Sequence, residues 1–180
     1  NIADWTSVFG VHLHRRRLEV LRELLQGQFV WTALDVGCGE GYLVEIGVRY
    51  TIGIDIRPGK GVTIFASAEY LPFKDEGFDF VFAGEVLEHL DRPLKALQDW
   101  ARVLKPCGTM LVSTPNGVLV GASRGNPEHK RTFAPQDIRV CLHRLGFKVV
   151  SSKGIFTGLV SGKKIFRWIK FDTVKKLLLR

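Results

Sequence analysis

The residues best suited to bind a charged ligand stand close together in the first quarter of the chain. Asp35 lies in a short apolar run, 32–36, and glycines follow it at alternate positions, Gly37, Gly39 and Gly41. Alternating glycines let the backbone turn sharply and approach a ligand closely. A carboxylate beside such a loop attracts a cationic group and repels a pyrophosphate. This stretch therefore predicts a strand, a ligand-binding loop and a helix, with an ammonium-bearing ligand at the loop.

The spacing of these glycines also argues against a dinucleotide ligand. In the pattern G-x-G-x-x-G, counted from Gly37 and Gly39, the third glycine would be the residue that is Tyr42 here. A nucleoside that carries an ammonium group fits this loop better than NAD. The alternative is that Asp35 is a buried acid that caps the following helix.

A second carboxylate, Asp55, ends another apolar run about 20 residues after Asp35, where dinucleotide-binding folds place the acid that binds ribose. A carboxylate only accepts hydrogen bonds, so it can bind both hydroxyls of a ribose. The alternative is an ordinary turn acid, because Arg57, Pro58 and Gly59 follow closely.

Six segments in order resemble the motifs of class I S-adenosylmethionine-dependent methyltransferases, most closely those of the type 11 small-molecule branch. These segments are 34–41, 53–56, 68–73, 78–81, 85–90 and 104–109. The resemblance covers residues 30 to 150. It implies transfer of a methyl group from S-adenosylmethionine to an oxygen or nitrogen nucleophile of a small molecule, with S-adenosylhomocysteine as the product.

The resemblance also implies which residues bind the donor. Asp35 would receive the methionine ammonium, Asp55 would bind the ribose hydroxyls, and Ile56 would stack on the adenine. Ser67 stands where many relatives have an aspartate for the adenine amine, so this part of the site carries less charge unless Glu69 compensates. The full expected donor set is Asp35, Gly37, Cys38, Gly39, Gly41, Asp55, Ile56, Ser67, Ala68, Glu69 and Glu85.

A group of acids and histidines follows the fourth apolar run. On a helix, Glu85, Glu88 and His89 would share one face. With His129 they could bind a divalent cation, in a pattern similar to that of magnesium-dependent O-methyltransferases. We expect no metal, because magnesium prefers oxygen ligands and metal-free relatives carry the same E-x-x-E-H pattern.

His89, with Glu88 beside it, is also the leading candidate for a general base, because imidazole titrates near neutrality. His12 and His14, in the expected N-terminal helix, are rivals for this role. A base is needed if the acceptor is a hydroxyl group, and is less necessary for an uncharged amine.

Apolar runs alternate with helical patterns, which predicts an α/β fold with a doubly wound, mostly parallel sheet and helices on both faces. The expected strands are 32–36, 51–56, 62–66, 78–83, 109–113 and 147–152, and the expected helices are 11–26, 41–48, 92–103 and 135–145. The residues between Asp55 and Val62 include Pro58 and two glycines, so we expect a loop and not a helix there. The antiparallel strand pair that ends the sheet in the family is not recognisable. Residues 115–130 predict a long loop that covers the site.

The basic character is concentrated at the end of the chain. The net charge is +8, and residues 161–180 hold seven basic residues against one acid. We expect a methyltransferase domain over 1–160, including an N-terminal capping helix, and a basic amphipathic tail over 161–180. This tail could dock on its own domain or on a neighbouring chain, bind RNA, or lie on an anionic membrane.

The remaining composition predicts a cytoplasmic protein, and the resemblance implies a small-molecule acceptor. Cys38, Cys107 and Cys141 are odd in number and widely spaced, which favours a reducing compartment, and no apolar run approaches a membrane span. The chain begins with Asn1, which is not an initiator methionine, and this leaves open whether the chain is trimmed. Two alternatives stay open: a non-catalytic donor-binding module that supports a partner, and an RNA methyltransferase that uses the tail. The sequence does not indicate the oligomeric state.

Overall fold

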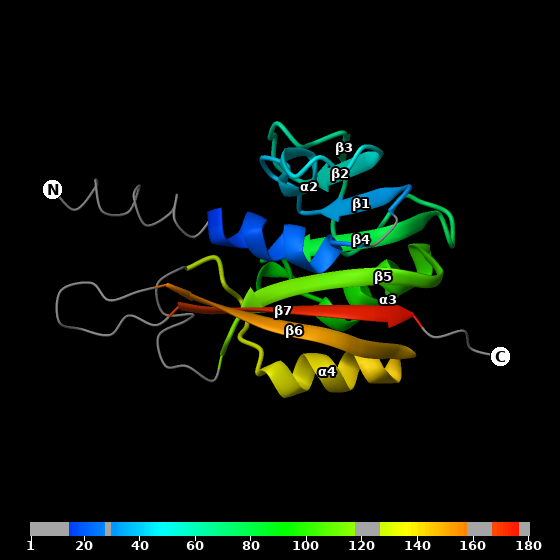
Figure 1. The fold of residues 1–180 in the computed structure, drawn as a ribbon. Helices are drawn as coiled ribbons and strands as arrows, with labels where there is room; N and C mark the ends of the chain where they lie inside the picture. Colours follow the sequence, from blue (N-terminus) through cyan, green and yellow to red (C-terminus); the bar gives the residue numbers. More distant parts are fainter. Residues whose placement is uncertain (1–14, 28–29, 118–126, 158–166, 177–180) are drawn as a thin grey trace, which may run out of the picture.

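The computed structural model describes residues 15–27, 30–117, 127–157 and 167–176, which form one sheet with helices on both faces (Figure 1). The strand order is β3-β2-β1-β4-β5-β7-β6. The strands are β1 (Ala33–Val36), β2 (Thr51–Asp55), β3 (Ile64–Phe65), β4 (Phe78–Gly84), β5 (Leu104–Pro115), β6 (Phe147–Thr157) and β7 (Arg167–Lys176). The first five pair in parallel, and β7 pairs antiparallel to both β5 and β6. The expected α/β fold is confirmed.

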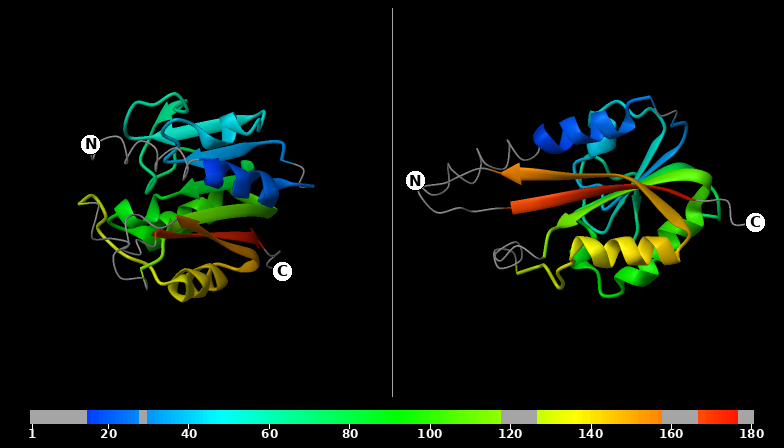
Figure 2. Two further views of the ribbon diagram at one scale, coloured as in Figure 1. Left: turned by 60° about the vertical axis from the view of Figure 1, so that its left-hand side comes forward. Right: turned by 60° about the horizontal axis from the view of Figure 1, so that its bottom comes forward.

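Helices cover the two faces of the sheet because the strand residues alternate in direction. In β4, Phe80 and Phe82 pack with helix 15–25 and α2 (Tyr42–Glu45). The intervening Val81 and Ala83 pack with residues of α3 (Pro93–Val103) and α4 (Pro135–Arg144) on the other face (Figure 2). Within the described residues, no helix has the length and apolar character needed to cross a bilayer.

The order of the strands creates the crevice in which ligands of such sheets bind. From β1 the chain runs outward to β2 and β3, and then returns to β4 on the other side of β1. Ligands bind beyond the carboxyl ends of the strands at this reversal. Asp35 in β1, Asp55 at the end of β2 and Glu85 directly after β4 are therefore brought to one edge.

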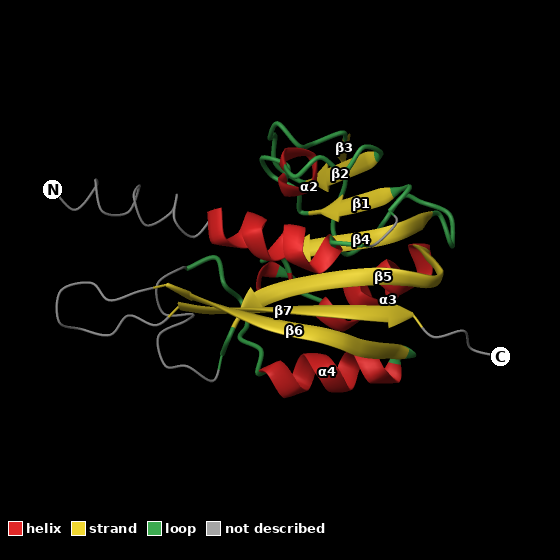
Figure 3. Cartoon of the chain, in the orientation of Figure 1, coloured by secondary structure: helices red, strands yellow, loops and turns green. Residues whose placement is uncertain are grey.

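The loop after β2 is as expected. Residues 56–63, all within the described part of the chain, form turns and bends without a helix, as the green trace in Figure 3 shows. The helix expected over 41–48 is shorter, because α2 ends at Glu45 and Gly47 takes a positive φ of 86°.

The end of the sheet differs from the expectation. An antiparallel pair is present, and β7 is inserted between β5 and β6. Residues 167–176 therefore pair with the sheet of their own domain, one of the positions considered for this tail. The run Trp168-Ile169-Lys170-Phe171 is rich in residues that favour strands, but the lysines within and around it are typical of an amphipathic tail. The rest of 161–180, the loop residues 118–126, and His12 and His14 lie outside the described residues.

Candidate active site

Asp35 is buried at the end of β1, with 1% of its surface exposed. Its Oδ2 accepts a hydrogen bond from the Leu43 backbone N–H at 3.5 Å, so the carboxylate contacts the start of α2. Burial, with a smaller contribution from the negative charge of Asp55, raises the pKa of Asp35 to about 7. A cation placed beside Asp35 would offset this cost and favour the ionised form. The geometry thus suits both helix capping and an ammonium ligand.

The glycine loop has one open position between two packed ones. A Cβ on Gly37 would lie 2.5 Å from the Val86 side chain, and one on Gly41 would lie 2.9 Å from Gly61 Cα. A Cβ on Gly39 would meet nothing within 4 Å, although its φ is +48°. Gly39 is therefore the position where the backbone faces open space. Cys38 is buried, and burial raises the pKa of its thiol to about 12, so its side chain stays neutral.

Asp55 joins the two loops at the carboxyl edge. Its Oδ2 accepts from Gly39 N–H at 3.0 Å and its Oδ1 accepts from Arg57 N–H at 2.9 Å. Each carboxylate oxygen has a second lone pair, so both can still accept a ribose hydroxyl. Ile56, which follows, is 72% exposed. An apolar side chain held open at the edge of a crevice is well suited to stack on a base.

The residues expected near the adenine are more constrained. Ser67 Oγ accepts from Glu69 N–H at 3.2 Å, and the carbonyl of buried Ala68 accepts from the Trp100 indole at 2.8 Å. Glu69 Oε1 accepts from Arg92 N–H at 2.5 Å, at the start of α3. The Glu69 carboxylate therefore serves a helix start, so it is less available to compensate for the missing charge at Ser67.

The expected helix after β4 does not form at Glu85, which has a φ of +59°. Only Leu87–His89 form a single 3-10 turn. The prediction that Glu85, Glu88 and His89 share one helical face is therefore wrong. The chain bends at Glu85 because its N–H donates to Ser113 O at 3.0 Å, while Ser113 Oγ donates to Glu85 Oε1 at 3.2 Å.

Glu88 is a buried acid beneath this turn, with 1% of its surface exposed. Thr114 Oγ1 donates to its Oε2 at 3.0 Å, and its Oε1 has no hydrogen-bond partner among the described residues. Burial, followed by the negative charge of Glu85, raises the pKa of Glu88 to about 8. The raised pKa favours the protonated form of this carboxyl group, which can itself donate a hydrogen bond.

Two histidines lie next to Glu88. Ligand atoms of Glu88, His89 and His129 lie within 4.8 Å of one another, an arrangement that could hold a metal ion. The imidazole rings are 4.9 Å apart between centroids, at 80°. His89 Nδ1 lies 3.1 Å from the Glu128 carbonyl oxygen. A neutral imidazole that donates from Nδ1 leaves Nε2 to accept a proton. Of the four ligands considered from sequence, the cluster contains three and leaves out Glu85.

Arg17 is a site residue that the sequence interpretation missed. A run of three arginines such as 15–17 is typical of a solvated helix face, yet only 17% of the Arg17 side chain is exposed. Its guanidinium lies 3.2 Å from Glu85 Oε2 and donates to the Tyr42 hydroxyl at 3.1 Å. The signal was its spacing: Arg17 stands four residues before buried Leu21, on the same side of the helix.

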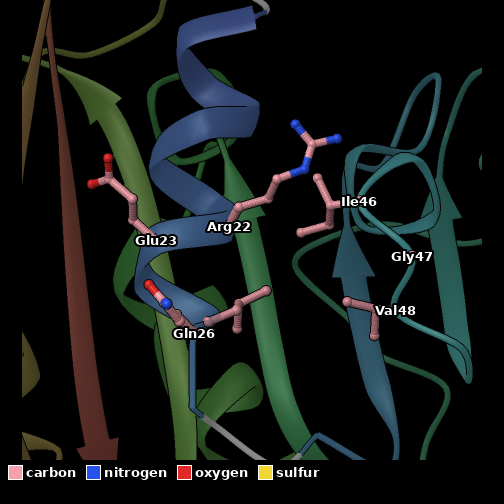
Figure 4. Close-up of a pocket in the computed structure, with 7 residues that line it drawn as sticks. Arg22, Glu23, Gln26, Ile46, Gly47 and Val48 are labelled. Carbon is pink, nitrogen blue, oxygen red and sulfur yellow. The ribbon is translucent and has the colours of Figure 1, made fainter.

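Two hollows on the surface lie away from these residues. One of about 430 Å³ lies between helix 15–25 and residues 46–48, where Figure 4 shows Arg22 extending toward Ile46. Another of about 570 Å³ is lined by residues at the opposite, amino-terminal edge of the sheet, among them Thr32 and Phe78. Neither includes an expected site residue.

Known proteins share this sequence pattern and fold. A family model described as a methyltransferase domain matches residues 34–112. The chain is 32% identical over 143 residues to a Mycolicibacterium smegmatis protein named as an S-adenosylmethionine-dependent methyltransferase, covering 69% of this chain and 55% of that protein. It is 31% identical over 153 residues to a ubiquinone biosynthesis O-methyltransferase of Dinoroseobacter shibae, covering 68% and 62% respectively. The chain thus spans little more than half the length of these curated relatives.

The solved structures agree on the fold. A Haloferax volcanii methyltransferase, solved in complex with the Trm112 methyltransferase activator, has a TM-score of 0.77 at 17% identity, covering 99% of this chain and 96% of that chain. The fold and the carboxylate-flanked glycine loop define a class I S-adenosylmethionine-dependent methyltransferase domain. Within that class, the chain belongs to the type 11 branch of methyltransferases.

Proposed function

We propose that this chain transfers a methyl group from S-adenosylmethionine to an oxygen or nitrogen nucleophile of a small molecule. The observation that carries the proposal is the pair of carboxylates, Asp35 and Asp55, on either side of the open position Gly39 at the strand-order reversal. The pair offers one acid for an ammonium group and one for a ribose. The spacing of the glycines in 37–41 disfavours a diphosphate ligand.

The donor would lie along the carboxyl edge between the two loops. Asp35 and the amides at the start of α2 would hold its amino-acid end, Asp55 its ribose, and Ile56 and Ser67 its adenine. The sulfonium of the donor supplies an electrophilic methyl group, so the protein mainly has to align the nucleophile and exclude water. In this proposal, the other members of the expected donor set contact the donor through their backbone or by packing.

His89 is the proposed base when the acceptor is a hydroxyl group. Its Nε2 would take the proton while Nδ1 faces the Glu128 carbonyl. Glu88 lies beside His89, and its raised pKa favours the protonated form. In that form Glu88 would donate a hydrogen bond through Oε1, the buried oxygen that has no partner among the described residues. The relative named as an O-methyltransferase supports an oxygen acceptor.

We further propose that the transfer needs no metal. Glu85 is engaged with Arg17 and Ser113, and the hydroxyl of Thr114 already binds Glu88. The remaining cluster offers two imidazoles, which magnesium disfavours.

A second candidate function is a donor-binding module that works with a partner protein. One observation favours it: Phe65 in the edge strand β3 is 69% exposed, and residues 56–63 provide no helix beside it. The similar Haloferax volcanii structure is a complex with a methyltransferase activator. Donor binding without transfer to any of a broad panel of acceptors would favour this candidate.

Calorimetric titration with S-adenosylhomocysteine tests the proposal, with NAD as the matched control. S-adenosylhomocysteine should bind in the titration and should also raise the melting temperature of the protein by linkage, and NAD should do neither. Binding of NAD alone would overturn the assignment of the donor site.

A further inference from the structure

Residues 127–131, here called the strap, are fixed to the turn that follows β4. The N–H groups of Lys130 and Arg131 both donate to the Glu88 carbonyl, at 2.8 and 3.2 Å. Lys130 Nζ also pairs with Asp91 at 2.8 Å, and the Arg131 guanidinium donates to the Asp91 carbonyl at 2.8 Å. Several backbone and side-chain bonds thus hold the strap on the β4 side.

On its other side the strap reaches the loop that follows β2. The Arg57 guanidinium donates to both carboxylate oxygens of Glu128, at 2.9 and 3.5 Å. In the sheet, β1 lies between β2 and β4, so this link joins the segments that follow the two neighbours of β1 at its carboxyl end. Neighbouring strands are about 4.8 Å apart, so the strap and the Arg57 side chain together bridge two strand spacings, from β4 to β2. The glycine loop, Gly37 to Gly41, follows this end of β1.

The strap also touches the candidate base. The Glu128 carbonyl faces His89 Nδ1, and His129 packs its ring against that of His89. On the donor side, the backbone N–H of Arg57 binds Asp55, the proposed ribose ligand. One short path of contacts therefore runs from Asp55 through Arg57 and Glu128 to His89.

The Arg57–Glu128 pair is unsuited to stabilise the fold, because the two side chains are 70% and 52% exposed. Exposed pairs contribute little to stability and weaken with salt. The pairing lowers the pKa of Glu128, so the carboxylate stays charged at neutral pH. A contact that is charged, exposed and easily screened can open and close while the backbone bonds on the β4 side persist.

We infer that Arg57 and Glu128 are positioning residues, which close the strap over the bound donor and slow the release of donor and product. This inference rests on the proposed function, because it requires a donor in the crevice beneath the strap. It adds two residues outside the expected donor set to the functional site.

The test is the dissociation rate of S-adenosylhomocysteine, measured by stopped-flow at low and high salt. In the unmodified protein, the rate should rise severalfold with salt, because salt screens the pair. Arg57→Glu or Glu128→Arg should each raise the rate about tenfold and remove most of its salt dependence, a change of about 1.4 kcal/mol in the barrier. The double variant Arg57→Glu/Glu128→Arg should return the rate to within about twofold of the original, as expected when one charge pair is reversed.

Lys60→Glu is the matched control. Lys60 lies in the same loop and pairs weakly with Glu40 at 3.9 Å, without reaching the strap. Its reversal should leave the rate nearly unchanged. A salt-independent rate in the unmodified protein, or a double variant no slower than the single ones, would overturn the inference. Failure of the unmodified protein to bind S-adenosylhomocysteine would instead refute the proposed donor site.

Discussion

At the scale of single residues, Asp55 matters most, because its carboxylate binds amides of both loops and faces the proposed ribose site. Asp55→Ala should weaken binding of S-adenosylhomocysteine by about 1.5 to 3 kcal/mol, the range for hydrogen bonds to charged groups. Calorimetry measures this loss. Glu40→Ala is the control, since Glu40 is an exposed acid next to Gly39. Equal affinities for Asp55→Ala and the unmodified protein would refute the role of Asp55.

Gly39 tests whether the backbone approaches a ligand. The position is open: a Cβ added at Gly39 meets no protein atom within 4 Å, so we expect the side chain in Gly39→Val to project into the crevice. The left-handed φ adds a strain of about 1–2 kcal/mol. We expect donor binding to be abolished while the circular dichroism spectrum stays native.

Gly27→Val separates strain from obstruction. Gly27 has a φ of +73° and equally open surroundings, but lies just after helix 15–25. This variant should bear similar strain and bind the donor normally. Loss of binding in both variants would show that strain alone explains the effect.

Glu88 should make the stability of the protein depend on pH. Its pKa is raised from 4.5 to about 8 in the folded state, so above pH 4.5 the folded protein binds a proton that the unfolded chain releases. The free energy of unfolding therefore falls as the pH rises from 4.5 to about 8. Asp35, with its raised pKa of about 7, acts in the same direction.

Glu88→Gln should reduce this dependence, because glutamine keeps a neutral polar group beside Thr114 and cannot ionise. Urea unfolding at several pH values measures the slope. The variant should lose less stability than the unmodified protein toward pH 8, while keeping the slope that Asp35 contributes. Identical slopes would contradict the raised pKa of Glu88.

At the scale of elements, the docking of helix 15–25 depends on a polar contact that covers the site. Arg17 links this helix to Glu85 after β4 and to Tyr42 in α2. Arg17→Ala leaves a largely buried Glu85 carboxylate without this cation, which should cost about 1–3 kcal/mol of unfolding free energy. Urea denaturation measures it. Arg16→Ala, whose side chain is 63% exposed, should have little effect, and an equal loss in both variants would contradict the role of Arg17.

Elements with strong local signals were predicted from sequence, and those that depend on distant contacts were not. The helix expected over 92–103 agrees with α3 to within one residue, and Pro58 with two glycines correctly predicted a loop after β2. The bend at Glu85 depends on Ser113 in β5, a contact that no local pattern contains. The insertion of β7 between β5 and β6 likewise depends on pairing between segments far apart in the chain.

At the scale of the whole molecule, the strand order determines which residues meet. Asp35 and Asp55 were predicted as a pair, because motif spacing places both at the carboxyl ends of neighbouring parallel strands. Arg17 and Glu128 were not, because their roles depend on a helix and a strap that pack from outside the sheet. The expected donor set and the division of the chain at residue 160 stay predictions.

The proposal that no metal is needed also concerns the assembled site, since Glu88, His89 and His129 come from two segments. Dialysis against a chelator should leave both donor binding and methyl transfer unchanged, because Arg17 already pairs with Glu85 and two of the three remaining ligands are imidazoles, which magnesium disfavours. The measurement is product formation before and after dialysis. Complete loss of activity that magnesium restores would reverse this prediction.

A crystal structure with S-adenosylhomocysteine tests the central claim most directly. The account predicts both ribose hydroxyls within hydrogen-bonding distance of Asp55, the adenine against Ile56, and the amino group near Asp35 beside the Gly37–Gly41 loop. A crevice that stays empty at saturating product, or one that takes a diphosphate in its place, would contradict it.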